Sequence, residues 1–158
     1  MNNQKVCSFY ISEFHLLTIV LPYINEKIEE QKDIAVILQN DINTNVKTYL
    51  RNVRNLNLNN EKLIKLNWKK SDRENINSSL KGKDIIVIGD KEYIDEVNEK
   101  LEKIGEECEI LNCYKVNEIE RIDKILASHN KILSTKGKKD VKKFSQNAQK
   151  RKTIKTQI

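Results

Sequence analysis

The chain has 158 residues, of which 38% are hydrophobic and 33% charged, and its formal net charge is +6. This length is typical of one domain that buries its own core, and the longest apolar run, residues 16–23, is too short to span a bilayer. Three cysteines at no ligand spacing, and a first segment without signal-peptide character, predict a reduced, cytoplasmic protein.

Strands and helices are expected to alternate along the first third of the chain. Residues 5–11 form an apolar run typical of a strand, and Ser12 is suited to cap a helix that extends to about Glu30. Residues 33–38 predict a second buried strand, and apolar side chains at helical spacing within residues 46–53 predict a second helix.

The next segment is more polar. Residues 55–62 are rich in Asn and predict a loop, whereas residues 63–68 alternate between apolar and polar side chains, which predicts a strand at an edge of the sheet. The segment 71–74 has the spacing of a capping box, so we expect a short third helix that extends to Leu80.

The strongest pattern in the chain follows this segment. Residues 85–88 are four consecutive apolar β-formers, which predict a strand buried on both faces. Residues 92–104 carry one apolar stripe at helical spacing, and Gly105 is suited to the left-handed residue that ends a helix. A strand followed by such a helix is half of a βαβ unit, and such units build parallel sheets.

Residues 109–116 predict a fifth strand, and Asn117 is suited to cap a last helix. The apolar stripe of that helix is Ile119, Ile122, Leu126, His129 and Leu133. The predicted fold class is therefore α/β, a doubly wound, mainly parallel five-stranded sheet with helices on both faces and a basic C-terminal extension. We expect either the Rossmann-like or the flavodoxin-like strand order, with the strand at residues 85–88 in the centre.

Basic residues are concentrated after residue 135. From Lys136 to the end, nine Lys or Arg oppose one acidic residue, so this segment carries +8 and the rest of the chain about −2. We therefore assign residues 1–135 to a single α/β domain and residues 136–158 to a basic, flexible tail. Such a tail favours non-specific contact with nucleic acid, and a solvated end without a partner is the alternative. The candidate nucleic-acid residues are Lys138, Lys139, Lys142, Lys143, Lys150, Arg151 and Lys152.

Several catalytic and phosphate-binding motifs are missing from the sequence. No two of the four glycines lie closer than seven residues, which excludes both G-x-G-x-x-G and a phosphate-binding P-loop. The sequence also contains no nucleophile elbow, no H-E-x-x-H and no C-x-x-C. We therefore expect neither a cofactor nor a metal.

Ligands of open α/β sheets bind beyond the carboxyl ends of the strands, and polar side chains follow several of the predicted strands. The predicted ligand-binding residues are Ser12, His15, Asn40, Asp41, Gly89, Asp90 and Tyr93. The alternative interpretation is that the Ser and Asp residues in this set only cap helices.

Few side chains suggest catalysis. His15 with Glu13 or Asp41 is the one candidate acid–base pair, and a packed histidine is the alternative. Cys113 is either a reactive thiol or a buried small hydrophobe. We expect His129 to lie in the core.

The first strand and helix resemble those of the MEDS sensory domains. The resemblance covers residues 5–55 and rests on the run from Cys7 to Ser12, on the Pro-aromatic pair within residues 21–24 and on the strand at residues 34–38. It implies a ligand-sensing relative of the RecA-like fold without a phosphate loop, serving transcription or signalling. The matching pattern positions are Tyr10, Ser12 and Pro22.

The predicted function is a non-catalytic, regulatory or sensory binding module for a small ligand, with its basic tail available to nucleic acid. The alternatives are a small enzyme that uses His15 and a structural adaptor.

Overall fold

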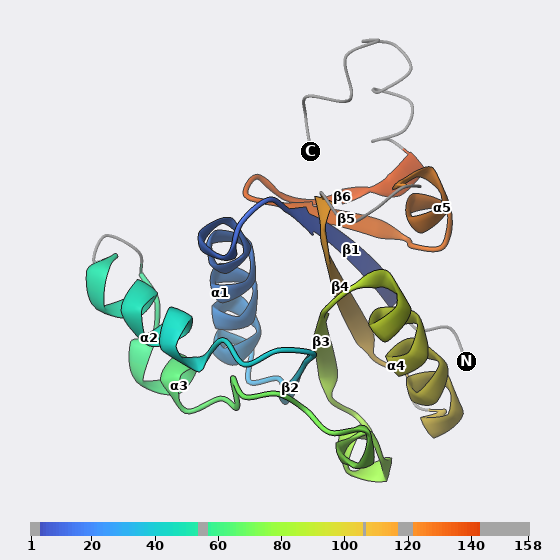
Figure 1. Cartoon of the computed structure of the whole chain (residues 1–158), viewed down its shortest axis with the longest axis horizontal. Coiled ribbons are helices and arrows are strands. Elements are labelled where there is room, and N and C mark those ends of the chain that lie inside the picture. Colours follow the sequence, from blue (N-terminus) through green and yellow to red (C-terminus); the bar gives the residue numbers. More distant parts are fainter. Residues whose placement is uncertain (1–3, 54–56, 106, 117–121, 143–158) are drawn as a thin grey trace, which may run out of the picture.

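The strand and helix with the strongest sequence pattern are confirmed. β3 (Asp84–Ile88) has four buried residues, and α4 (Lys91–Ile104) follows it with Asp90 as N-cap and Gly105 as a left-handed C-cap with a φ of 75°. The computed structural model describes residues 4–53, 57–105, 107–116 and 122–142. Within this part, β3 lies between two parallel neighbours, one of which is an edge strand, so its predicted position in the centre of the sheet is wrong (Figure 1).

The sheet has six strands in the order β2 (Ile34–Leu38), β3, β4 (Glu109–Lys115), β1 (Gln4–Tyr10), β5 (Lys131–Ser134) and β6 (Gly137–Asp140). All neighbours are parallel except β5 and β6, which form an antiparallel hairpin. The protein is therefore α/β with a mixed, mostly parallel sheet, as the fold class predicted, but the expected five strands are wrong.

The expected strand orders are wrong as well. In the Rossmann-like and flavodoxin-like orders the first strand lies beside the second strand, whereas β1 here lies between β4 and β5. Its register places Gln4 opposite Glu109 and Val6 opposite Lys131. Because β1, β3 and β4 are all apolar runs buried on both faces, their patterns predict strands without predicting which strands are neighbours.

The predicted edge strand at residues 63–68 is a helix and a turn. α3 (Asn60–Ile64) begins inside the expected loop, and the chain then folds back so that the Trp68 indole nitrogen donates to the Leu63 carbonyl at 2.8 Å. Leu63 and Trp68 are both buried in the same core. Their apparent alternation comes from two separate contacts with that core and not from a pleated strand.

The predicted capping box at residues 71–74 is also wrong. The Ser71 hydroxyl accepts a hydrogen bond from Leu38 N at 3.1 Å, and Ser71 N donates to the Leu38 carbonyl at 2.9 Å, so Ser71 pairs with the outer edge of β2. Two short 3-10 turns, η1 (Arg73–Asn75) and η2 (Ser78–Leu80), replace the expected helix.

The last predicted helix is shorter than expected. α5 spans Ile122–Ala127, and residues 131–134 form β5 in place of the helix's last turns. The hairpin continues into β6, so it crosses the expected domain boundary after residue 135. Asn117 lies outside the described residues, as do Lys143, Lys150, Arg151 and Lys152 of the predicted tail.

Helices cover both faces of the sheet (Figure 1). α1 (Glu13–Glu29), α2 (Asn43–Asn52) and α3 share one buried cluster with alternate strand residues, and α4 and α5 share the other. Val6 and Leu111 point to the α1 face, whereas Cys7 and Ile110 point to the α4 face. None of the helices in the described ranges is long and apolar enough to cross a membrane.

Candidate functional site

The topology singles out the carboxyl ends of β1 and β4. From β1 the chain crosses by α1 to β2 at one edge of the sheet, and from β4 it passes by α5 to β5 in the opposite direction. The two helices lie on opposite faces. Neighbouring strands whose connections leave in opposite directions form a switch point, where open α/β sheets bind ligands. Tyr10 and Lys115 are the last residues of the two strands.

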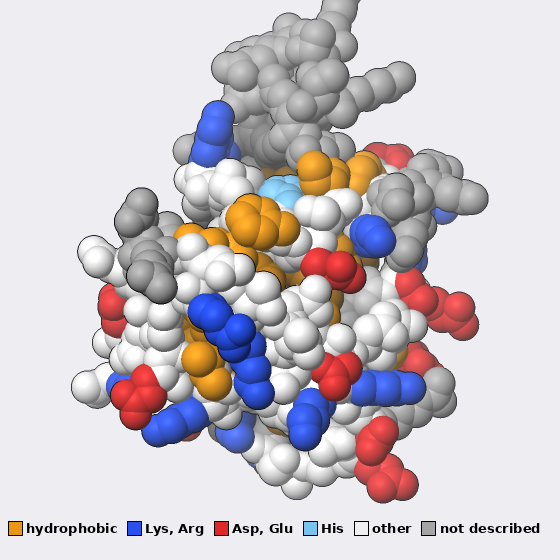
Figure 2. Space-filling model, turned by 60° about the vertical axis from the view of Figure 1, so that its left-hand side comes forward, with side chains coloured by type: hydrophobic (Ala, Val, Ile, Leu, Met, Phe, Trp, Pro, Cys, Tyr) orange, Lys and Arg blue, Asp and Glu red, His pale blue; other side chains and the backbone are white. Residues whose placement is uncertain are grey.

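Two large hydrophobic side chains are exposed just beyond β1. Ile11 is 64% exposed and Phe14 is 63% exposed, and the Phe14 ring lies 5.2 Å from the Tyr49 ring of α2. His15 is half-buried. Figure 2 shows hydrophobic side chains beside a histidine on this part of the surface. We call Ile11, Phe14 and His15 the β1-end patch.

Hydrogen bonds fix the conformation of this patch. Ser12 caps α1, because its hydroxyl accepts from His15 N at 3.1 Å. The His15 ring turns back on the strand end, and its Nδ1 accepts from Ile11 N at 3.0 Å. A backbone N–H can only donate, so Nδ1 carries no proton and the neutral ring is protonated at Nε2. Burial lowers the pKa of His15, which favours this neutral form.

The remaining predicted ligand residues gather at the ends of β2 and β3. Asp90 Oδ1 accepts from Tyr93 N at 2.8 Å, while Oδ2 accepts from Gln39 Nε2 at 3.0 Å and Asp90 N donates to Gln39 Oε1 at 2.8 Å. Asp41 Oδ1 accepts from Asn43 N at 2.8 Å, and Asn40 is exposed. Asp90 is therefore the N-cap of α4, as the capping interpretation predicts, and its second oxygen binds Gln39. Asp41 is not a cap, because the N-cap of α2 is Ile42, but its carboxylate accepts from the first residue of that helix.

Gly89 and Tyr93 are held by close packing. A Cβ atom on Gly89 would lie 2.6 Å from Cδ2 of Tyr93 and 2.9 Å from Oε1 of Gln39. Within the described ranges, the Tyr93 hydroxyl is buried without a hydrogen-bond partner. Burial, together with the charge of Glu96, raises the pKa of Tyr93, so this hydroxyl is neutral and keeps its proton to donate.

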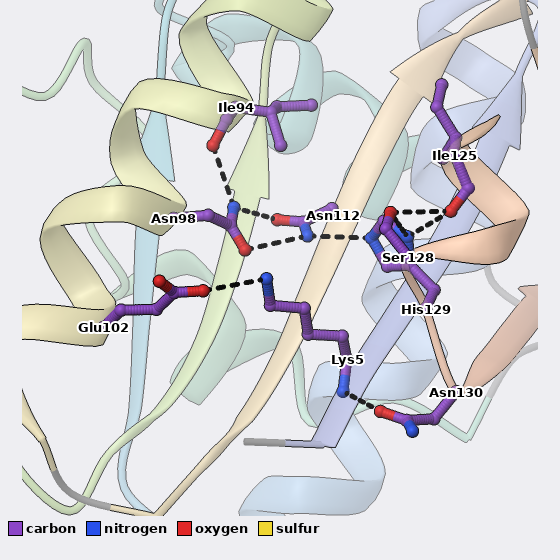
Figure 3. Close-up of polar contacts among 9 residues, drawn as sticks. All are labelled: Lys5, Ile94, Asn98, Glu102, Asn112, Ile125, Ser128, His129 and Asn130. Atoms are coloured by element: carbon purple, nitrogen blue, oxygen red, sulfur yellow. Dashed lines mark hydrogen bonds and ion pairs between the residues drawn. The ribbon is translucent and has the colours of Figure 1, made fainter. Parts of the chain in front are cut away.

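A second polar group lies on the α4 face of the sheet, and the sequence patterns did not single it out (Figure 3). Asn98 of α4 donates to the Ile94 carbonyl at 2.9 Å and to Asn112 Oδ1 at 2.8 Å. Asn112 of β4 donates back to Asn98 Oδ1 at 3.1 Å and contacts His129 Nε2 at 3.0 Å. His129 Nδ1 lies 2.6 Å from the Ile125 carbonyl.

The direction of these hydrogen bonds shows that His129 does not activate Ser128. Both hydrogens of the Asn112 amide are donated, one of them to His129 Nε2, so Nε2 is unprotonated and Nδ1–H donates to Ile125 O. The Ser128 hydroxyl lies 3.0 Å from Nδ1 but also donates to Ile125 O at 2.9 Å. A general base needs a free lone pair facing the nucleophile, and Nδ1 has none.

A third polar cluster lies at the opposite, amino end of the strands. The Lys27 ammonium contacts Asp84 Oδ2 at 3.1 Å and Glu109 Oε2 at 2.7 Å, and Glu109 Oε2 also accepts from the Tyr23 hydroxyl. Lys138 of β6 reaches Glu109 Oε1 at 3.1 Å. Two cations therefore neutralise two carboxylates, and this predicted nucleic-acid lysine is part of an ion-pair cluster.

Two of the described thiols are buried, and the described residues contain no group of metal ligands. Burial raises the pKa of Cys7 to about 12 and raises that of Cys113 as well, and both side chains are buried. Cys113 is therefore a buried small hydrophobe, the alternative that its position in β4 left open. Among the described residues, no three His, Cys, Asp or Glu side chains are grouped as metal ligands.

Two residues of the α4-face network had a signal in the sequence. Asn98 lies four residues after Ile94 and three before Leu101, which places it on the buried stripe of α4. Asn112 alternates with Ile110 and Tyr114, which places it on a buried face of β4. A polar side chain at a core position needs a buried partner, and two asparagines at such positions predict each other.

No family model, curated protein or solved structure was found to match the chain. The candidate sites consequently depend on the geometry of the chain itself.

Proposed function

We propose that this protein is a non-catalytic binding module whose ligand surface is the β1-end patch. The observation that carries the proposal is the fixed tautomer of the His15 ring beside two exposed hydrophobic side chains. The patch offers an apolar surface from Ile11 and Phe14 and a hydrogen-bond donor from His15 Nε2. A ligand that suits it is a small molecule with a planar or apolar part and an acceptor atom.

The fixed tautomer argues against the enzyme alternative. A general base at His15 needs an unprotonated nitrogen facing the substrate, but Nδ1 is occupied by Ile11 N and Nε2 carries the proton. The other histidine of the chain, His129, has its basic nitrogen occupied by Asn112. The two histidines therefore act as donors, which suits recognition better than proton abstraction.

A sensory role of the MEDS type is part of this proposal. Tyr10 and Ser12, two of the three pattern positions, lie at the carboxyl end of β1 beside the proposed surface. The third, Pro22, is exposed inside α1 and contributes nothing to the patch.

The proposal is tested by a thermal-shift screen of the full chain against nucleotides and common metabolites. A hit should lose its stabilising effect in Phe14→Ser. The matched control is Ile64→Ser, because Ile64 is also an exposed hydrophobic residue, 41% exposed, but lies in α3 away from the strand ends.

Three results would count against this assignment. A hit that stabilises Phe14→Ser and the unsubstituted protein equally would show that the β1-end patch is not the ligand surface. Turnover of a hit that is lost in His15→Ala, with stability retained, establishes the enzyme alternative. A screen without any shift favours an adaptor that binds protein partners.

Contact with nucleic acid is a separate proposal, carried by the charge of +8 from Lys136 onward. Of the candidates within the described residues, Lys139 and Lys142 are exposed and Lys138 pairs with Glu109. Exposed lysines favour non-specific attraction to phosphates over base recognition.

A further inference from the structure

The hydrogen bonds between Asn98, Asn112 and His129 form one chain with fixed ends (Figure 3). At one end Asn98 donates to the Ile94 carbonyl, and at the other His129 donates to the Ile125 carbonyl. Both ends are backbone carbonyls of helices, which accept and never donate. The orientation of each amide and the tautomer of the imidazole are therefore determined by the backbone.

A proton on His129 Nε2 cannot be accommodated by rearranging this chain. It would face the Asn112 amide nitrogen at 3.0 Å, donor against donor. Turning the Asn112 amide by half a rotation moves the conflict to its contact with Asn98. Turning Asn98 as well brings its oxygen against the Ile94 carbonyl oxygen, which is fixed within α4. Every arrangement leaves one mismatch, which is partly buried at His129 and fully buried at Asn98, and a fully buried mismatch costs about 1–3 kcal/mol.

We propose that His129 is a proton-sensitive latch that holds α5 on the sheet: when the ring takes up a proton, its bond to Asn112 breaks and α5 separates from α4 and β4. Both α5 and its following turn are short, and Ile125 and Leu126 are the buried residues of α5. The hydrogen bond from Asn112 ties that turn to β4, a central strand of the sheet.

The charges around His129 come from three elements and oppose one another. Lys5 of β1 disfavours a positive ring, and Asp95 of α4 favours it. Tyr114 of β4 packs its neutral ring edge-on, with the ring centres 6.0 Å apart. Burial has the largest effect and lowers the pKa of His129, so the latch is closed at neutral pH.

Asn130, the residue after His129, limits how far the separation of α5 from the sheet can spread. Asn130 N donates to the Lys5 carbonyl at 2.8 Å, and Lys5 N donates to Asn130 Oδ1 at 2.8 Å. These bonds contain no group that titrates near neutral pH, and they hold the start of β5 against β1. Opening should therefore involve α5 and the turn at residues 128–129 while the β5–β6 hairpin stays in place.

The experiment uses the full chain with His15→Gln, in which His129 is the only histidine. Nitrogen-15 NMR of the ring should show the proton on Nδ1 at neutral pH and a titration midpoint below the ordinary value of 6.5. Amide hydrogen exchange, corrected for its intrinsic pH dependence, should accelerate below that midpoint at Ser128 and His129. Asn98 in α4 should be unaffected. The acceleration should be about tenfold for each pH unit by which burial displaces the midpoint.

Asn112→Asp is the matched variant, because a carboxylate would accept from a protonated Nε2. It should raise the His129 midpoint and abolish the opening of α5 on acidification, because the protonated ring keeps its bond to residue 112. Three results in the His15→Gln chain with Asn112 kept would each overturn the proposal. They are a proton on His129 Nε2 at neutral pH, a His129 midpoint at or above 6.5, and an exchange rate at Ser128 that does not change as His129 titrates. These measurements in the His15→Gln chain decide the question even when Asn112→Asp fails to fold.

Discussion

Lys27 Nζ lies 2.7 Å from Glu109 Oε2, so a buried ammonium of α1 is joined to the first residue of β4. The same ammonium reaches Asp84 at the start of β3. The side chain of Lys27 is 8% exposed and that of Glu109 is 14% exposed. An ion pair this far removed from water is costly to break by removing one partner, since the other charge stays buried.

Glu109→Gln should therefore lower the free energy of unfolding by about 3 kcal/mol, because Lys27 and Lys138 lose a shared carboxylate while the shape of the side chain is kept. Urea unfolding followed by circular dichroism measures the change. Glu102→Gln is the control: Glu102 is 61% exposed and pairs with Lys5 at 3.4 Å, so its loss should cost less than about 1 kcal/mol. Equal effects in the two variants would contradict the role assigned to the buried cluster.

Acid should weaken the fold through the same carboxylate. Its hydrogen bonds from Lys27 and Tyr23 outweigh burial and hold the pKa of Glu109 at about 2, below the ordinary value of 4.5. The folded state thus binds this proton later than the unfolded state, and stability falls as the pH decreases from about 4.5 to about 2. In Glu109→Gln this part of the acid sensitivity should disappear. A parallel decline of both proteins between these pH values would show that other carboxylates are responsible.

Gly89→Ala should destabilise the protein by crowding. The added Cβ would lie 2.6 Å from the Tyr93 ring and 2.9 Å from Gln39 Oε1, closer than real contacts allow, so a loss of about 1–3 kcal/mol is expected. Gly105→Ala separates crowding from backbone strain, because its Cβ meets nothing within 4 Å while its φ is +75°. Combining each change with Tyr93→Ala should recover part of the loss for Gly89 and none for Gly105. Thermal denaturation of the three single and two double variants provides the comparison.

A chain that ends at Lys142 should bind nucleic acid more weakly than the full chain. It keeps β6 and the Lys138–Glu109 ion pair. The removed segment contains five basic residues and no acidic residue. The slope of log affinity against log salt should fall by at most about 4.5, because each phosphate contact contributes about 0.9. Mobility-shift titrations at several salt concentrations measure both slopes. Identical slopes would remove residues 143–158 from the interaction.

Cutting at Thr135, the domain boundary that composition suggests, should instead destabilise the protein. Residues 137–140 pair with β5, and Val141 is buried on the α4 face. A shortened chain that ends at Thr135 and melts at the same temperature as one ending at Lys142 would contradict this role of the hairpin.

Local signals explain which parts of the fold are predictable. The β3 strand, the Asp90 cap, the stripe of α4 and Gly105 follow one another within 22 residues, and each supports the same assignment. By contrast, the helical spacing of Ile122, Leu126 and His129 continues to Leu133 by coincidence. The helix ends at Ala127, and the Asn130 backbone then bonds to Lys5 on a strand far away in sequence.

In the candidate sites, too, features set by nearby residues were predictable and features set by distant contacts were not. Ser12 and Asp90 were predictable as strand-end residues, and their capping bonds are local. The tautomer of His15 depends on a bond to Ile11, four residues away, but the fixed state of His129 depends on partners in α4 and β4. A sequence pattern can place Asn98 and Asn112 in the core, but only the packing of α4 on β4 brings them together.

The position of β1 inside the sheet has a consequence for how the chain is made. Gln4 pairs with Glu109, 105 residues later, and Val6 pairs with Lys131, so β1 leaves the ribosome well before β4 and β5, the strands on either side of it. Until then, β2 and β3 can pair with each other, while both edges of β1 lack a native neighbour. Such long-range closure slows folding, and it leaves an apolar strand unprotected throughout synthesis. The nascent chain should thus depend on chaperones until β4 and β5 are available to β1.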